Sequence, residues 1–341
     1  MGNYRLNILA ACLILFFACA SDKGNNQKSS AQKSDKAAQP KVDVPKFSAD
    51  SAYYFVDKQV GFGPRVPNTA EHKACGDWLI SKMESWADNV HVQKAELKAF
   101  NGEILKARNI IAEFNPQAKK RIMLSAHWDT RPFADQDPNA AAREKPIDGA
   151  NDGASGVGVL MEIARQLSQQ KPEIGIDIIF WDAEDYGQPD VDMKNPRMSD
   201  SYCLGSQYWA KNKHRSNYTA KYGILLDMVG AEDATFRLEG HSMQFAPTLN
   251  RKIWNKSIEL GFGRYFILEE TRPIIDDHFY ITRIAKIPTI DIIDLKPHKR
   301  IQFGDFWHTH DDNMEIISPE TLKAVGQTLL EVIYLEDKGL F

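Results

Sequence analysis

Short apolar runs alternate with longer amphipathic stretches along most of this 341-residue chain. Runs rich in Val, Ile, Leu and Phe predict β-strands over residues 90–100, 107–114, 121–126, 176–181, 222–226 and 287–293. Apolar residues that recur every three or four positions predict helices over 47–61, 69–86, 154–170, 202–213, 245–260 and 319–335. Strands that alternate with helices predict an α/β fold, a single-domain α/β/α sandwich with a mixed, mostly parallel sheet. We expect the first two strands to pair antiparallel.

The N-terminus has the composition of a targeting segment. Residues 1–18 carry one charged residue and an apolar stretch that is too short to span a bilayer, which predicts a signal peptide. The letters Phe-Phe-Ala-Cys that end at Cys19 resemble a loose lipobox and predict a lipid on Cys19. Cys12 also ends such a stretch, but few apolar residues precede it, and an ordinary cleaved signal peptide is the other alternative.

Residues 19–45 are rich in Ser, Lys, Gln, Asn and Ala, which predicts a flexible, lipid-anchored tether before a catalytic domain over 46–341. We therefore expect export to a bacterial periplasm, with membrane contact only through the N-terminal lipid anchor.

Acidic and histidine residues stand where the predicted strands end or in the turns that follow them. They are His127, Asp129, Asp152, Glu184, Asp185, Asp227 and His308. Ligands of open α/β sheets bind at the carboxyl ends of the strands, so we expect these side chains to converge. The long irregular segments 130–147 and 186–200 are expected to form walls of the site.

Asp152, Asp185 and His308 are the strongest candidates for zinc ligands. Three protein ligands leave one tetrahedral position open, which is typical of catalytic zinc. Glu184 directly precedes Asp185, and neighbouring residues at the end of a strand point to different sides, so Glu184 stays free to act as acid and base. Each residue alone has an ordinary interpretation as a turn residue, a helix cap or a surface histidine. Together, and in this order, they favour a metal centre.

Composition narrows the alternatives. A net charge of −4 that is spread along the chain gives no sign of nucleic-acid binding, and the 43% hydrophobic fraction is enough for a packed core. Cys75 and Cys203 permit a disulfide in an oxidising compartment or two buried thiols, and neither has metal-ligand spacing.

Several motifs, taken in order, resemble the zinc-dependent M28 exopeptidases. They are His-x-Asp at 127–129, Gly-Ala-x-Asp-x-Ala-Ser-Gly around Asp152, Asp-Ala-Glu-Asp at 182–185, Leu-Asp at 226–227 and Trp-His-Thr-x-x-Asp at 307–312. Within that group three runs resemble the glutaminyl cyclases of the animal type and their bacterial lipoprotein relatives. These are Leu-Leu-Asp-Met-Val-Gly-Ala at 225–231, Asp-Asp-His at 276–278 and Trp-His-Thr-His-Asp-Asp-Asn at 307–313. The resemblance covers roughly residues 50–338.

The resemblance implies a role for each matching residue. These roles are zinc binding by Asp152, Asp185 and His308, proton transfer by Glu184, a hydrogen-bonded acidic pair of Asp227 and Asp276, and lining or support of the site by His127, Asp129 and Trp307. Two carboxylates that close cannot both ionise cheaply, so we expect that pair to share a proton. The chain also departs from the pattern. Asp185 stands where animal cyclases have Glu, residues 186–208 lack an expected tryptophan, and Ala126 replaces a cysteine, so the expected disulfide is absent.

The expected reaction is cyclisation of the N-terminal glutamine of peptides or proteins to pyroglutamate, with release of ammonia. One zinc ion would act as Lewis acid and Glu184 as proton shuttle. The rival is an aminopeptidase in which His127 and Asp227 bind a second zinc ion bridged by Asp152, and all of these ligands are present. A metal-free binding protein is the third alternative, and it is disfavoured because no candidate ligand is lost.

Overall fold

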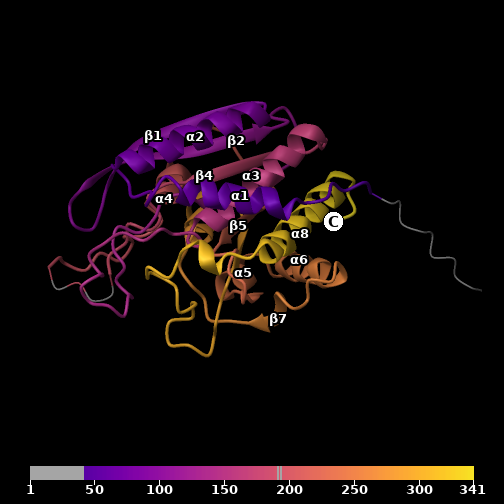
Figure 1. The fold of residues 1–341 in the computed structure, drawn as a ribbon. Coiled ribbons are helices and arrows are strands. Elements are labelled where there is room, and N and C mark those ends of the chain that lie inside the picture. The colour runs from indigo at the N-terminus through magenta and orange to yellow at the C-terminus, as the bar shows by residue number, and fades with distance from the viewer. Residues whose placement is uncertain (1–41, 190–191, 193) are drawn as a thin grey trace, which may run out of the picture. The chain divides into compact units, whose positions relative to one another are not determined.

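The computed structural model describes residues 42–189, 192 and 194–341. Its main sheet has the strand order β1-β2-β4-β3-β5-β8 (Figure 1). The strands are β1 (Asn89–Lys98), β2 (Ile104–Phe114), β3 (Arg121–His127), β4 (Gly175–Trp181), β5 (Gly223–Asp227) and β8 (Thr289–Ile293). β2 pairs antiparallel with β1 and with β4, whereas β4, β3, β5 and β8 are mutually parallel neighbours. The predicted mixed sheet and its antiparallel first pair are confirmed.

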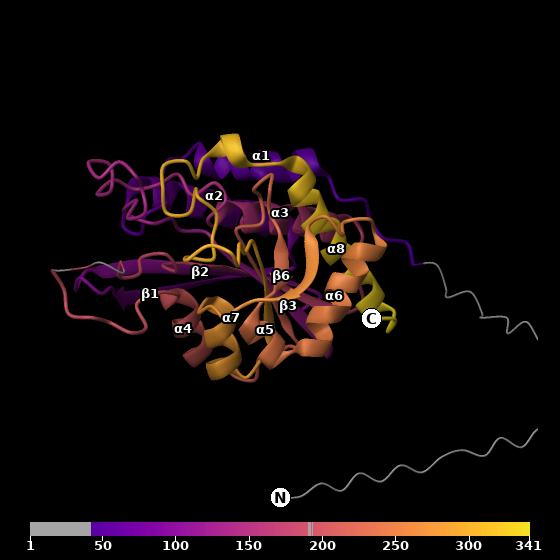
Figure 2. The same cartoon turned by 90° about the horizontal axis from the view of Figure 1, so that it is seen from below.

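Helices cover both faces of this sheet, as Figure 2 shows. On one face lie α1 (Ala49–Val60), α2 (Ala70–Trp86), α3 (Ala154–Gln169) and α8 (Pro319–Asp337), and on the other lie α4 (Leu204–Lys211), α7 (Asp277–Tyr280) and the π-helix η1 (Ile281–Ala285). α5 (Gly240–Phe245) packs against β8, and α6 (Pro247–Glu259) packs against α8. A parallel pair, β6 (Phe236–Leu238) and β7 (Phe266–Glu270), and the 3₁₀ turn η2 (Met314–Ile316) complete the described elements.

The apolar runs become strands because both of their faces are covered. Every residue of β3, β4, β5 and β8 is buried. The larger apolar cluster lies on the α1, α2, α3 and α8 side, and a smaller one around Trp181 and Trp209 lies on the α4 side. The four parallel strands are therefore packed on both faces, and their carboxyl ends lie at fixed positions along one edge of the sheet.

The predicted helix over 245–260 was wrong at its start. The chain instead forms α5, bends at Ala246 with φ −148° and ψ 59°, and begins α6 at Pro247. Proline lacks a backbone N–H and has a fixed φ, so it fits the first turn of a helix but not its interior. The short elements β6, β7 and α7 had no periodic pattern long enough to predict them.

Helix α3 lies unusually close to the sheet and to α1. A Cβ on Gly156 would lie 2.5 Å from the Leu226 carbonyl oxygen and 2.9 Å from the Ala126 Cβ. A Cβ on Gly158 would lie 2.5 Å from Val56 Cγ2. Only glycine fits these two contacts, and the close approach fixes the N-terminus of α3 beside the ends of β3 and β5.

The predicted signal peptide (1–18) and most of the predicted tether (19–45) lie outside the described residues. The compact unit begins at Val42, and Val42 and Val44 pack against the larger apolar cluster, so the last residues of that segment contact the domain. Within the described part of the chain, no helix combines the length and the apolar composition needed to cross a membrane.

We predict that Gly156→Ala destabilises the fold, because the new methyl group meets a backbone carbonyl of β5 that has no room to move. Overpacking of this kind costs about 1–3 kcal/mol of unfolding free energy, measurable by urea denaturation. Gly263→Ala is the matched control, since its Cβ would meet only the Ile258 side chain at 3.6 Å. Equal stability of the two variants would contradict the close packing of α3.

Candidate active site

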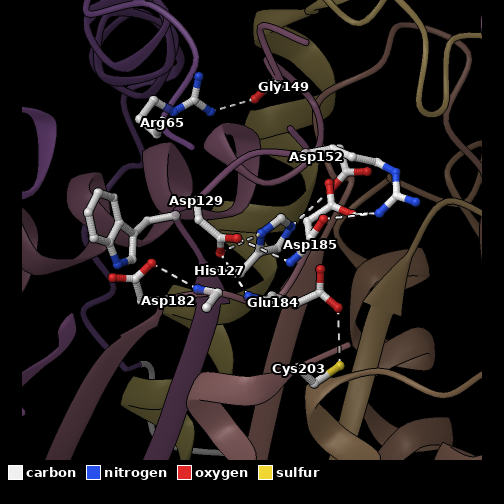
Figure 3. A network of polar contacts seen from close by, with 12 residues as sticks. Arg65, His127, Asp129, Gly149, Asp152, Asp182, Glu184, Asp185 and Cys203 are labelled. Carbon is white, nitrogen blue, oxygen red and sulfur yellow. Dashed lines mark hydrogen bonds and ion pairs between the residues drawn. The ribbon is translucent and has the colours of Figure 1, made fainter. Parts of the chain in front are cut away.

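The acids and histidines selected from the sequence converge at the carboxyl ends of β3, β4, β5 and β8. Figure 3 shows five of them close together: His127, Asp129, Asp152, Glu184 and Asp185. The converging side chains border a cavity of about 380 Å³. Of the predicted site residues, those that line this cavity are Asp152, Glu184, Asp185, Asp227, Asp276, Trp307 and His308. His127 and Asp129 are buried and do not belong to its lining, so they support the site from within the protein.

The Asp129 carboxylate holds the turn that carries Glu184 and Asp185. Its Oδ1 accepts a hydrogen bond from the Glu184 N–H at 3.0 Å, and its Oδ2 accepts one from the Asp185 N–H at 3.1 Å. The turn begins at Ala183, whose φ of 55° is left-handed. A non-glycine residue in this region is uncommon and turns the chain sharply after β4. Glu184 and Asp185 consequently point in different directions, as the adjacency of the two acids predicted.

Asp152, Asp185 and His308 bring one ligand atom each within 4.8 Å of the others, and all three are buried. His308 Nε2 lies 3.3 Å from Asp185 Oδ1 and 3.8 Å from Asp152 Oδ2. Asp185 Oδ2 has no hydrogen-bond partner among the described residues. An imidazole nitrogen and two carboxylates that face one another across this distance are suited to zinc, with a position left open towards the cavity.

Neighbouring groups orient these three side chains. His308 Nδ1 lies 3.1 Å from Asp135 Oδ1, which directs Nε2 towards the two aspartates, as in many metal-binding histidines. Arg131 is fully buried and donates to both the main-chain oxygen and the carboxylate of Asp185, at 3.0 and 3.2 Å. Asp312 accepts the N–H of Asp152 at 3.0 Å.

A second group of possible ligands lies on the other side of Asp152. His127 Nε2 is 3.0 Å from Asp152 Oδ1 and 3.3 Å from Asp227 Oδ1. Gly153 allows the imidazole to lie against the main chain, because a Cβ there would be 2.3 Å from Nε2. The ligands of the two-zinc alternative are thus also in reach of one another.

The pKa values of the two histidines follow from this crowding of acids. Burial lowers the pKa of His127, but contacts with Asp129, Asp152 and Asp227 raise it well above its usual value. Burial and the Arg131 charge lower the pKa of His308, and Asp185 and Asp135 raise it. The net shift of both pKa values is upward, so the surrounding acids favour positive charge at the position where a cation would bind.

Glu184 is separate from both groups of ligands. Burial and the charges of Asp185, Asp276 and Asp277 raise its pKa well above the usual value of a glutamic acid. Its Oε1 accepts a hydrogen bond from the Cys203 thiol at 3.1 Å. A buried carboxyl group with a raised pKa, open to the cavity, has the properties of an acid–base catalyst.

Asp227 and Asp276 line the same cavity. Burial raises the pKa of Asp227 to about 7, and the charges of Asp152 and Asp276 add to the rise. Burial also raises the pKa of Asp276, and the charge of His278 opposes that rise. The Cys203 Sγ atom lies 4.0 Å from Asp276 Oδ1, and the sharing of a proton between Asp227 and Asp276 stays a prediction.

Behind Asp276 lies a buried network that the sequence did not reveal. His278 Nε2 is 3.0 Å from Glu239 Oε2, and His278 Nδ1 is 3.7 Å from Asp291 Oδ2. Burial and the charge of Asp276 raise the pKa of Asp291 well above its usual value. The signals available in the sequence were the run Asp-Asp-His at 276–278 and the acid Asp291 inside the apolar run of β8.

Aromatic and aliphatic side chains form the rest of the cavity wall. The Trp307 ring is stacked on His308, with ring centroids 3.5 Å apart. The other apolar and aromatic residues that line the cavity are Tyr202, Met228, Ile274, Ile275, Ile293 and Phe303. Cys75 and Cys203 are both free and buried, so they form no disulfide.

Residues 109–333 match the model of peptidase family M28. The chain belongs to peptidase family M28. Among solved structures it is similar to a Bacteroides thetaiotaomicron glutaminyl cyclase bound to N-acetylhistamine, with 55% identity, TM-score 0.83, and 86% of this chain and 99% of that one covered. A leucine aminopeptidase precursor from the same species gives 54% identity, TM-score 0.83 and the same coverage. A glutaminyl-peptide cyclotransferase from Drosophila melanogaster is 25% identical over 281 residues, which cover 76% of this chain and 73% of the fly protein.

The M28 assignment agrees with the donor set, and both support zinc at this site. Sequence reasoning found the residues that carry the chemistry, because strand ends and local motifs reveal them. It missed Arg131, Asp135, Cys203 and Asp291, which act on those residues from distant parts of the chain.

Glu239 provides a pH-dependent test of the buried network. Burial alone would raise the pKa of Glu239, but His278 and the N–H groups of His241 and Ser242 lower it to about 2. Because the folded state depresses this pKa, ionised Glu239 stabilises the fold at pH values above its ordinary pKa near 4.5. That stabilisation is lost as the pH falls from 4.5 towards 2. Glu239→Gln should therefore be less stable than wild type at pH 7, and the difference should shrink on acidification. Urea midpoints measured with a chelator present check this, and a pH-independent difference would contradict it.

Proposed function

We propose that this chain converts an N-terminal glutamine of peptides or proteins to pyroglutamate and releases ammonia. One observation carries the proposal: the three-residue ligand group and an unbound acid, Glu184, share one small cavity. The similarity to a glutaminyl cyclase at 55% identity over 99% of that chain supports the same reaction.

A single zinc ion held by Asp152, Asp185 and His308 fits this proposal. When bound, zinc supplies a Lewis acid that polarises the carbonyl group of the substrate's side-chain amide. Arg131 and Asp135 hold Asp185 and His308 in place for that purpose.

Glu184 moves the proton. The substrate's neutral α-amine attacks its own side-chain amide carbon, so a carbon–nitrogen bond forms to the α-nitrogen and the bond to the amide nitrogen breaks. The Glu184 carboxylate takes one proton from the attacking amine and returns it to the leaving nitrogen, which departs as ammonia. Because nucleophile and target belong to one residue, the protein needs mainly to hold the chain in the reactive conformation.

The cavity suits an uncharged side chain beside an amine. Asp227 and Asp276 present acceptors for the N–H groups of the substrate, and the Trp307 ring offers an apolar wall. A volume of about 380 Å³ accommodates one amino-acid residue, and its open side lets the rest of the peptide leave.

The rival is an aminopeptidase that uses a second ion on His127 and Asp227. Two observations support this alternative: the short distances between those ligands and the similarity to a leucine aminopeptidase precursor. The aminopeptidase reaction requires water as nucleophile and a second metal ion. The reaction products and the number of metal ions per chain therefore distinguish it from the cyclisation.

We predict that the purified, zinc-loaded protein releases ammonia from an N-terminal-glutamine dipeptide and contains about one zinc ion per chain. A leucyl chromogenic amide, assayed in parallel, should stay intact. Glu184→Gln should keep its zinc and lose roughly 10²- to 10⁴-fold in turnover, because it removes the acid–base group. Leucine release with two zinc ions per chain would favour the aminopeptidase, and unchanged turnover in Glu184→Gln would remove that residue from the mechanism.

Export and lipidation belong to the proposal as well. Residues 1–18 act as a signal peptide and Cys19 carries the lipid that anchors a periplasmic enzyme through its tether. In cells fed labelled palmitate, we expect label in the wild-type protein and none in Cys19→Ala. Equal labelling of both would refute the anchor at Cys19.

A further inference from the structure

The Glu184 side chain has a single anchor. Cys203 Sγ lies 3.1 Å from Glu184 Oε1, and Figure 3 shows the two side chains pointing towards each other. Among residues 42–189, 192 and 194–341, no other side chain hydrogen-bonds to this carboxyl group. The direction of the carboxylate in the cavity therefore depends on one thiol.

Two main-chain hydrogen bonds fix the thiol opposite the carboxylate. The Cys203 N–H donates to the Glu184 carbonyl oxygen at 2.9 Å, and the Leu204 N–H donates to the Ala183 carbonyl oxygen at 3.0 Å. Cys203 also has a left-handed φ of 57° and is fully buried. The segment before α4 is thus tied to the turn after β4, and its conformation directs the side chain at Glu184.

The thiol also lies beside a second acid of the cavity. Cys203 Sγ is 4.0 Å from Asp276 Oδ1, so it stands between Glu184 and Asp276. A buried thiol next to two acids keeps its proton and remains an S–H donor rather than a thiolate. The cyclisation needs no thiol nucleophile, because the substrate's own amine attacks.

We propose that Cys203 is a positioning residue for the cyclisation: its S–H group holds Oε1 of Glu184, so that the other carboxylate oxygen faces the reacting amine. The inference rests on the proposed function of Glu184. A thiol is a weak donor, so it fixes the direction of the carboxylate without competing strongly with the substrate. A displacement of about 1 Å at a reacting group is enough to lower the rate by roughly 10²-fold.

Two substitutions at one position test this role. Cys203→Ala removes the donor and should lower kcat by roughly 10- to 100-fold with KM nearly unchanged, because substrate binding is retained and proton transfer is not. Cys203→Ser restores a donor and should recover most of kcat. Cys75→Ala is the matched control, since Cys75 is a free, buried thiol in α2 that does not line the cavity, and its kcat should equal that of wild type.

Four measurements distinguish positioning from a general loss of structure. Zinc content and thermal stability should be similar in Cys203→Ala and Cys203→Ser. In a Glu184→Gln background, Cys203→Ala should have little further effect on kcat, because the two residues act as one unit. The infrared S–H stretching band of Cys203 should shift in Glu184→Gln, while the band of Cys75 stays in place.

A wild-type kcat in Cys203→Ala, or an equal effect with and without Glu184, would overturn the positioning role while leaving the proposed function intact. Absence of ammonia release from glutamine peptides in the zinc-loaded wild type would instead overturn the proposed function, and the positioning role with it.

Discussion

The burial of several carboxylates at one edge of a sheet is the constraint on which the site depends. Asp152, Asp185, Asp227 and Asp276 are each less than a tenth exposed and all face one cavity. Buried like charges repel strongly, so they persist only with positive partners close by. The chain supplies two imidazoles and the guanidinium of Arg131, and the raised pKa values of His127 and His308 show that these acids still demand positive charge. A divalent cation satisfies that demand, which links the fold to the metal.

The parallel strands deliver the ligands, but acids outside the cavity set their geometry. Asp129 accepts the N–H groups of Glu184 and Asp185, and Asp312 accepts those of Asn151 and Asp152. Each of these carboxylates fixes a turn that carries a candidate ligand. Each carboxyl group accepts the N–H groups of two consecutive residues, so it holds its turn at two points. Ligands held in this way keep the geometry that a metal ion requires, and they do not turn towards neighbouring hydrogen-bond donors.

Sequence patterns were sufficient for the main sheet and for the acids at the strand ends that line the cavity. Buried strands read as apolar runs, and acids at strand ends converge because parallel strands share an edge, which is how Asp152, Glu184 and Asp227 could be selected. The break at Ala246 was missed because apolar periodicity continues across Pro247. Cys203 and Asp291 were missed for a different reason. Their roles arise from contacts across more than a dozen residues, and no local spacing records such contacts.

Adjacent acids acquire different chemistry because of what surrounds them. Glu184 and Asp185 are joined by one peptide bond, yet Asp185 faces Arg131 and His308 whereas Glu184 faces a neutral thiol. Asp185 therefore lies among cationic groups at the candidate metal position. Burial without a cationic hydrogen-bond partner raises the pKa of Glu184 and lets it exchange a proton. The left-handed turn at Ala183 makes this separation possible, since an ordinary extended continuation of β4 would not place the two side chains in these separate environments.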